Sequence, residues 1–121
     1  MTAFSGNDDD NLINLDQQYG EGPHTYYAKG GNDIVYGGSD SIGDSRDEIY
    51  GGDGDDSLYG RGDGDLLYGG DGDDNLYGGA GDDDIYGEAG ADEIYGGDGN
   101  DNLYGGDDDD LMFGGNGDDQ M

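Results

Sequence analysis

A nine-residue repeat fills the sequence from residue 51 onward and constrains the fold more than any other feature. An aromatic residue recurs at every ninth position, an aliphatic residue precedes it, and an Asp stands two positions before the aliphatic residue. The aromatic residues are Tyr50, Tyr59, Tyr68, Tyr77, Tyr86, Tyr95, Tyr104 and Phe113. A period this short predicts one small unit stacked many times, here a six-residue turn followed by a three-residue strand.

Each unit is numbered so that Gly51 takes position one, Asp56 position six, Leu58 position eight and Tyr59 position nine. Strand side chains alternate between the two faces. The aliphatic residues at position eight are therefore predicted to form the core between two short parallel sheets, and the aromatic residues at position nine are predicted to point outward.

The repeat continues upstream with a weaker consensus. Four upstream segments keep all or part of the register: 5–13, 19–27, 28–36 and 42–50. Two insertions of five residues, near 14–18 and 37–41, complete a count of twelve units. We therefore expect one domain over 1–121, with degenerate repeats in 5–50 and regular repeats in 51–121.

The composition limits what the chain can bind and how it can fold. It holds 30 Gly and 28 Asp among 121 residues, and its net charge is −29. Only three Lys and Arg residues are present, which excludes a basic surface for nucleic acid. No apolar run can span a bilayer, and the absence of Cys excludes disulfides and thiolate metal sites. Few large aliphatic residues and high charge predict that the chain is unfolded without a ligand.

The turns carry the chemistry that a metal ion needs. A segment such as 51–56 offers carboxylate and backbone carbonyl oxygens, and its glycines allow these carbonyls to converge. Oxygen ligands in a flexible arrangement favour Ca²⁺ over Mg²⁺, which demands a tighter octahedron. The sequence therefore predicts calcium sites in the turns.

The pattern Gly-Gly-x-Gly-x-Asp-x-apolar-x resembles the RTX, or haemolysin-type calcium-binding, nonapeptide repeat family. Seven full units cover 51–113, and a partial unit covers 114–121. The resemblance implies an all-β fold, a right-handed parallel β-roll (β-solenoid) of about six coils with two units in each coil. It also implies that each ion lies between two stacked turns, held by carbonyls of the Gly-rich stretch and by position-six carboxylates.

Alternate turns stack on the same edge of such a roll. The first edge would carry turns 5–10, 28–33, 51–56, 69–74, 87–92 and 105–110, and the second 14–24, 37–47, 60–65, 78–83, 96–101 and 114–119. The expected position-six ligands are Asp10, Asp33, Asp56, Asp65, Asp74, Asp83, Asp92, Asp101, Asp110 and Asp119. The other expected metal-site residues are Gly51, Gly52, Asp53, Gly54, Gly69, Gly70, Asp71, Gly72, Gly78, Gly79, Gly81, Gly96, Gly97, Asp98, Gly99, Gly105, Gly106 and Asp107.

This arrangement predicts about eight ions, five on the first edge and three on the second. Both insertions fall on the second edge, where His24 replaces the Asp and the gap toward Asp47 is doubtful. Arg61 and Glu88 replace the second Gly of their turns, and Arg61 brings a cation near a metal site.

The expected function is that of a calcium-binding structural module of a secreted RTX-type protein, which folds on binding calcium outside the cell. The resemblance implies an extracellular location and bacterial type I secretion, and the missing cap and signal at the end predict a fragment of a larger protein or an engineered chain. Its partners would be calcium ions and other domains of that protein. No Ser/His/Asp set, Cys nucleophile or phosphate loop is present, so no enzyme is expected, and His24 is interpreted as a loop residue.

The aligned tyrosines leave a second function open. The simpler interpretation is that the tyrosine side chains only pack against their neighbours on adjacent strands. The alternative is an extracellular carbohydrate- or surface-binding, adhesin-like module that uses the exposed tyrosine rows, with glycans as partners. Ice binding is disfavoured because Thr2 and Thr25 are the only threonines.

Overall fold

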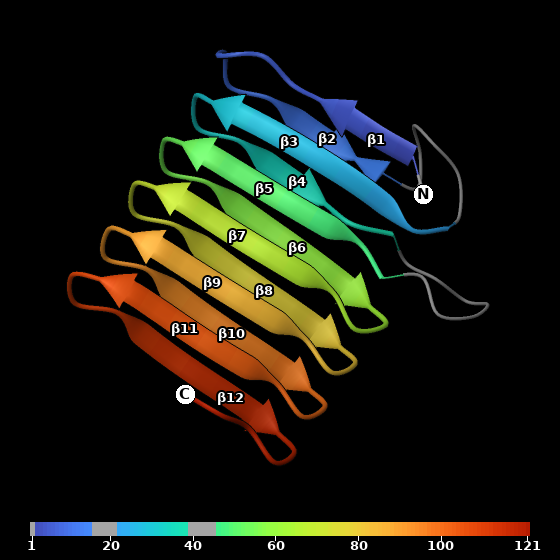
Figure 1. Ribbon diagram of the computed structural model, residues 1–121, viewed down its shortest axis with the longest axis vertical. Coiled ribbons are helices and arrows are strands. Elements are labelled where there is room, and N and C mark those ends of the chain that lie inside the picture. Colours follow the sequence, from blue (N-terminus) through green and yellow to red (C-terminus); the bar gives the residue numbers. More distant parts are fainter. Residues whose placement is uncertain (1, 16–21, 39–45) are drawn as a thin grey trace.

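The structure, a computed structural model, describes residues 2–15, 22–38 and 46–121. Its strands stack in two layers along the long axis of the molecule, from β1 and β2 at one end to β11 and β12 at the other (Figure 1). The strands are β1 (Thr2–Ser5), β2 (Leu12–Asn14), β3 (His24–Gly30), β4 (Ile34–Tyr36), β5 (Glu48–Asp53), β6 (Ser57–Gly62), β7 (Leu66–Asp71), β8 (Asn75–Ala80), β9 (Asp84–Ala89), β10 (Glu93–Asp98), β11 (Asn102–Asp107) and β12 (Leu111–Asn116).

Consecutive strands alternate between the two sheets. One six-stranded sheet has the order β1-β3-β5-β7-β9-β11, and the other has the order β2-β4-β6-β8-β10-β12. Every paired neighbour is parallel, so two strands and two turns make one coil. The predicted β-roll of about six coils is confirmed.

Strand pairing fixes the register of the coils. In the regular part, paired residues are 18 apart, as in Tyr50 with Tyr68. Thr25 pairs with Glu48, 23 residues on, so this coil holds five extra residues. In the first coil, Leu12 pairs with Ile34, 22 residues on, which leaves only four extra residues.

The pairing corrects the register predicted for segment 5–13. Ile13 pairs with the buried Val35 and thus takes position eight, and Asn14 pairs with Tyr36 at position nine. The unit is therefore 6–14, and Asn11 occupies position six where Asp10 was expected. The ends of β2 and β3, and of β4 and β5, place both longer connections on the second edge. The insertions predicted near 14–18 and 37–41 fall largely within 16–21 and 39–45, which lie outside the described residues.

The strands are longer than predicted. Each regular strand has six residues and runs from position seven through position three of the next unit, as in Leu66–Asp71. Gly52 still pairs with Gly70, and Asp53 with Asp71, because stacked turns of equal length keep their backbones in register. The three-residue estimate was wrong for this reason, and only positions four to six remain unpaired as turn.

The core follows position eight, as predicted. Leu58, Leu67, Leu76, Ile85 and Ile94 are fully buried. Tyr26 takes position eight in β3 and is buried as well, and Leu15 joins the same cluster from the connection after β2. Each sheet contributes only one row of apolar side chains to the interior. The stability of the fold must therefore also depend on interactions within the turns.

Candidate metal centre

The position-six aspartates form a hydrogen-bonded ladder along each edge. On the first edge, the backbone N–H of Asp56 donates to Oδ1 of Asp74 at 2.7 Å, and the N–H of Asp74 donates to Oδ1 of Asp92 at 2.9 Å. On the second edge, Asp65 donates in the same way to Asp83 at 2.6 Å. One oxygen of each carboxylate is therefore used to hold the preceding turn.

The other carboxylate oxygen has no protein partner. Seven position-six side chains are at most 2% exposed, and each has a buried Oδ2 without a hydrogen bond. They are Asp33, Asp56, Asp65, Asp74, Asp83, Asp92 and Asp101. Buried polar atoms are normally paired, so seven equivalent exceptions indicate a missing common ligand.

Backbone carbonyls face the same spaces between turns. In the gap between turns 69–74 and 87–92, a Cβ added to Gly69 would collide with Oδ2 of Asp74 and with the carbonyl oxygen of Gly87. In the same gap, a Cβ on Gly90 would collide with the carbonyl oxygen of Gly72. Oxygens from two successive coils therefore lie close to positions one and four of these turns, where glycine has no Cβ to collide with them. This donor set is the one that a hard cation such as Ca²⁺ prefers.

Burial makes the ionised carboxylates costly in the absence of a cation. Desolvation raises the pKa of Asp65 to about 8, that of Asp74 and Asp83 to about 7, and that of Asp56 to about 6. Neighbouring carboxylates raise these pKa values further, and backbone hydrogen bonds offset only part of the effect. A divalent cation in the gap would relieve both desolvation and repulsion.

The turn backbone needs left-handed conformations at positions two and four. Gly70 and Gly72 have φ of 121° and 133°. Lys29, Arg61 and Glu88 take position two at φ between 81° and 89°, so the turn tolerates these replacements. The guanidinium of Arg61 lies 5.0 Å from the centre of the Tyr36 ring and donates to the carbonyl of Gly37, in the preceding coil.

The gap between turns 6–11 and 28–33, near the N-terminus, differs from the seven. Asn11 donates its backbone N–H to Oδ1 of Asp33, and its side-chain amide contacts the same oxygen. Asp10 belongs instead to position five, where its Oδ1 accepts the N–H of Asn32 at 2.9 Å. The structure thus removes Asp10 from the predicted position-six ladder.

On the second edge, His24 takes position six as predicted, and its N–H donates to Oδ1 of Asp47 at 2.8 Å. The interpretation of His24 as a loop residue was wrong, because His24 is the first residue of β3 and is only 3% exposed. Oδ2 of Asp47 accepts the N–H of Gly38 at 2.6 Å, so both oxygens of this carboxylate have protein donors. In this respect Asp47 differs from the seven position-six aspartates of the other gaps.

The remaining predicted residues fall into three groups. Asp110 and Asp119 accept the N–H groups of Asp92 and Asp101 at 3.0 Å and are only half-buried, since they belong to the last turn on each edge. The position-three side chains are exposed and do not enter the gaps: Asp53, Asp71, Asp98 and Asp107. The predicted glycines of positions one, two and four line the gaps: Gly51, Gly52, Gly54, Gly69, Gly70, Gly72, Gly78, Gly79, Gly81, Gly96, Gly97, Gly99, Gly105 and Gly106.

Sequence reasoning missed Gly38, Gly60 and Gly87 as gap residues, although their position-one or position-two placement could have identified them. Within 2–15, 22–38 and 46–121, no group of three or more His, Cys, Asp or Glu side chains is placed to hold a metal ion.

A comparison with protein families matches four copies of the RTX calcium-binding nonapeptide repeat, over residues 25–41, 43–67, 59–94 and 86–121. These matches cover well over half of the sequence. The chain belongs to this family. Comparisons with curated proteins and with solved structures found no match.

Membership identifies this RTX chain as a set of calcium-binding repeats on a β-solenoid. The family is a structural calcium-binding repeat, typical of secreted proteins. In the described part of the chain, no helix has the length and apolar character needed to cross a membrane.

Proposed function

We propose that this RTX chain is a calcium-dependent structural module of a secreted protein, unfolded in the cytosol and folded by calcium outside the cell. The observation that carries the proposal is the set of seven buried, unpartnered Oδ2 atoms, six of which lie near a backbone carbonyl of the next turn on the same edge. Extracellular calcium modules bind in the range of about 10⁻⁴–10⁻³ M, which matches such a switch.

The proposed ligands follow from the seven gaps. Each gap takes Oδ2 of one position-six Asp and carbonyls from the two turns that enclose it. The first edge supplies four gaps through Asp33, Asp56, Asp74 and Asp92, and the second supplies three through Asp65, Asp83 and Asp101. We therefore propose seven ions, one fewer than the sequence predicted, because Asn11 replaces a carboxylate in the first gap.

Calcium binding and folding are coupled in this arrangement. Every gap joins two coils, so an ion binds only when both coils are formed. Without cations, a net charge of −29 opposes compaction. Folding should thus be cooperative in calcium and absent in chelator.

Circular dichroism during titration with Ca²⁺, repeated with Mg²⁺, tests the proposal. We expect a sigmoidal gain of β signal with Ca²⁺ and none with Mg²⁺ at the same concentration, and about seven ions by calorimetry. A native β signal in excess chelator would refute it. The type I secretion route is tested separately, by export of the parent protein through such a system.

The stacked tyrosines do not favour the carbohydrate-binding alternative. A sugar packs on the open face of an aromatic ring. In both tyrosine rows the ring faces cover one another at 4.7–5.0 Å between centroids, so the interior rings present mainly their edges.

A further inference from the structure

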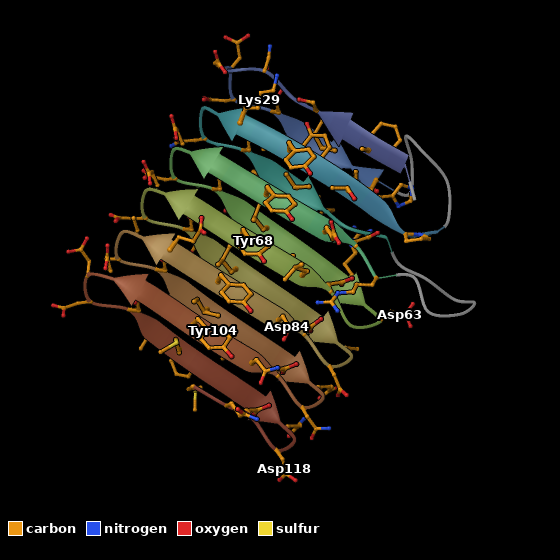
Figure 2. The ribbon with its side chains drawn as sticks, viewed as in Figure 1. Lys29, Asp63, Tyr68, Asp84, Tyr104 and Asp118 are labelled. Atoms are coloured by element: carbon orange, nitrogen blue, oxygen red, sulfur yellow. The ribbon has the colours of Figure 1, made fainter. Side chains whose placement is uncertain are left out.

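Two rows of stacked tyrosines run along the outer faces of the roll. On the odd-numbered sheet, the tyrosine ladder A comprises Tyr27, Tyr50, Tyr68, Tyr86 and Tyr104. On the other sheet, the tyrosine ladder B comprises Tyr36, Tyr59, Tyr77 and Tyr95, and Phe113 ends it. Tyr68 and Tyr104 mark ladder A on the viewed face of the molecule (Figure 2).

The rings within each ladder are close and nearly parallel. Centroid distances are 4.7–4.9 Å in ladder A, with interplanar angles of 7–15°. In ladder B, the Tyr59–Tyr77 and Tyr77–Tyr95 pairs lie at 4.8 and 5.0 Å with angles of 3° and 2°. The spacing equals that of adjacent strands, so the fold itself holds equivalent ring atoms of successive coils beside one another.

We propose that the tyrosine ladders are sites of oxidative cross-linking, in which neighbouring tyrosines of successive coils are joined as dityrosine by a one-electron oxidant of the peroxidase class. Each of two tyrosines loses one electron and its phenolic proton. The two phenoxyl radicals form a carbon–carbon bond between ring positions ortho to the oxygens, and the two ring hydrogens at these positions move to the oxygens. Hydrogen peroxide accepts the two electrons and two protons, so two tyrosines and one peroxide give one dityrosine and two waters.

The surroundings of the ladders suit this chemistry. Tyr27 and Tyr104 are 44% and 50% exposed, which gives an oxidant access to the ends of ladder A. The hydroxyl of Tyr95 donates to the carboxylate of Glu93, which can take the phenolic proton when the electron leaves. The chain has no Trp and no Cys, so no such side chain competes with tyrosine for one-electron oxidation.

The ladders also contain their own controls. Phe113 stacks on Tyr95 at 5.0 Å, as a tyrosine does, yet it cannot form a phenoxyl radical. A Tyr→Phe change should therefore keep the stack while it removes a reactive partner. Ladder A offers four tyrosine pairs and ladder B offers three.

The test oxidises the full chain in saturating CaCl₂ with a haem peroxidase and hydrogen peroxide, followed by dityrosine fluorescence and mass-spectrometric mapping of linked peptides. We expect links within one chain between ladder neighbours only, at a yield per chain that does not depend on protein concentration. Tyr68→Phe should abolish two linked pairs, whereas Tyr104→Phe at the end of ladder A should abolish one.

Links mainly between different chains, links between tyrosines that are not neighbours, or equal losses from the two variants would each overturn the proposal. The inference rests on the proposed function only for its calcium dependence, and a parallel reaction in chelator separates the two. Neighbour links of equal yield in chelator would support the ladder chemistry and count against calcium-dependent folding. Loss of neighbour links in chelator would support both.

Discussion

Replacing Asp74 by Asn should have opposite effects with and without calcium. Asp74 is 1% exposed, its Oδ1 accepts the N–H of Asp56, and its Oδ2 is buried without a partner. Asn keeps the shape and the Oδ1 acceptor but removes the charge. The side-chain amide would lie beside the carbonyl of Gly87, to which it can donate.

The size of the stabilisation expected without calcium follows from the pKa of Asp74. Burial raises this pKa from 3.8 to about 7, so an ionised Asp74 destabilises the metal-free roll. Each unit corresponds to about 1.4 kcal/mol, which gives an upper limit of about 4 kcal/mol above pH 7. Asp74→Asn should therefore stabilise the metal-free roll by up to this amount.

With calcium the sign reverses, because the variant loses a charged ligand in the gap between turns 69–74 and 87–92. The lost ion would have contributed about 2.7 kcal/mol at a free calcium concentration 100 times its Kd, and about 4.1 kcal/mol at 1,000 times its Kd. The loss outweighs the metal-free gain wherever that gain is smaller than this contribution. Calorimetry should give six ions instead of seven, and the calcium midpoint should rise.

The matched control is Asp71→Asn, which removes the same charge from an exposed side chain of the same turn. Metal-free folding can be measured in chelator by titration with a protecting osmolyte, which favours compact states. We expect Asp74→Asn to fold at lower osmolyte and at higher calcium than the parent chain, and Asp71→Asn to change both far less. Equal shifts in the two variants would mean that net charge alone governs folding, and the role given to Oδ2 would be refuted.

Three further predictions follow from the same geometry. In chelator, the β signal should increase as the pH falls from about 8 toward 4. The reason is that Asp65 and Asp83 have pKa values of about 8 and 7 in the folded chain and 3.8 in the unfolded chain, so they take up protons more readily when folded. Circular dichroism against pH checks this, and a loss of β signal over this range would contradict it. Gly99→Ala should cost about 1–3 kcal/mol in urea unfolding with calcium, because φ is 141° and the new Cβ meets the carbonyl of Gly81, whereas the exposed Asp98→Ala should change stability by about 0.5 kcal/mol or less. Asn11→Asp should add an eighth ion by calorimetry, and an unchanged count would contradict the proposed ligand rule.

The regular part of the fold could be predicted from the sequence because side-chain alternation and the nine-residue period determine it. Leu76 had to point inward and Tyr77 outward once the strand was recognised, and both do. The strand length could not be predicted in the same way. Gly and Asp have low strand propensity, yet parallel stacking of identical turns pairs Gly70 and Asp71 with their equivalents in the preceding coil.

The register of the first unit was predicted wrongly because its local signals are weak. Three consecutive Asp residues at 8–10 offer several candidates for position six, and no aromatic residue marks position nine, which Asn14 occupies. Pairing of the buried Val35 with Ile13 decides the register, because a shift of one residue would turn Ile13 outward and Leu12 inward.

Asp47 shows where a repeat consensus stops predicting a metal site. By sequence it is a position-six Asp like Asp65, and its Oδ1 is used in the same way, by the N–H of His24. Two groups distinguish Asp47 from Asp65. The N–H of Gly38 satisfies the Oδ2 that remains unpartnered in Asp65, and Nδ1 of the His24 ring lies 3.4 Å from Oδ1 of Asp47. Burial raises the pKa of both carboxyls, but in Asp47 the hydrogen bonds from Gly38 and His24 and the nearby His24 ring offset part of this effect, so Asp47 needs a cation less than Asp65 does. Whether a carboxylate in this fold requires calcium thus depends on whether a backbone N–H reaches its Oδ2, and for Asp47 that N–H comes from its own turn.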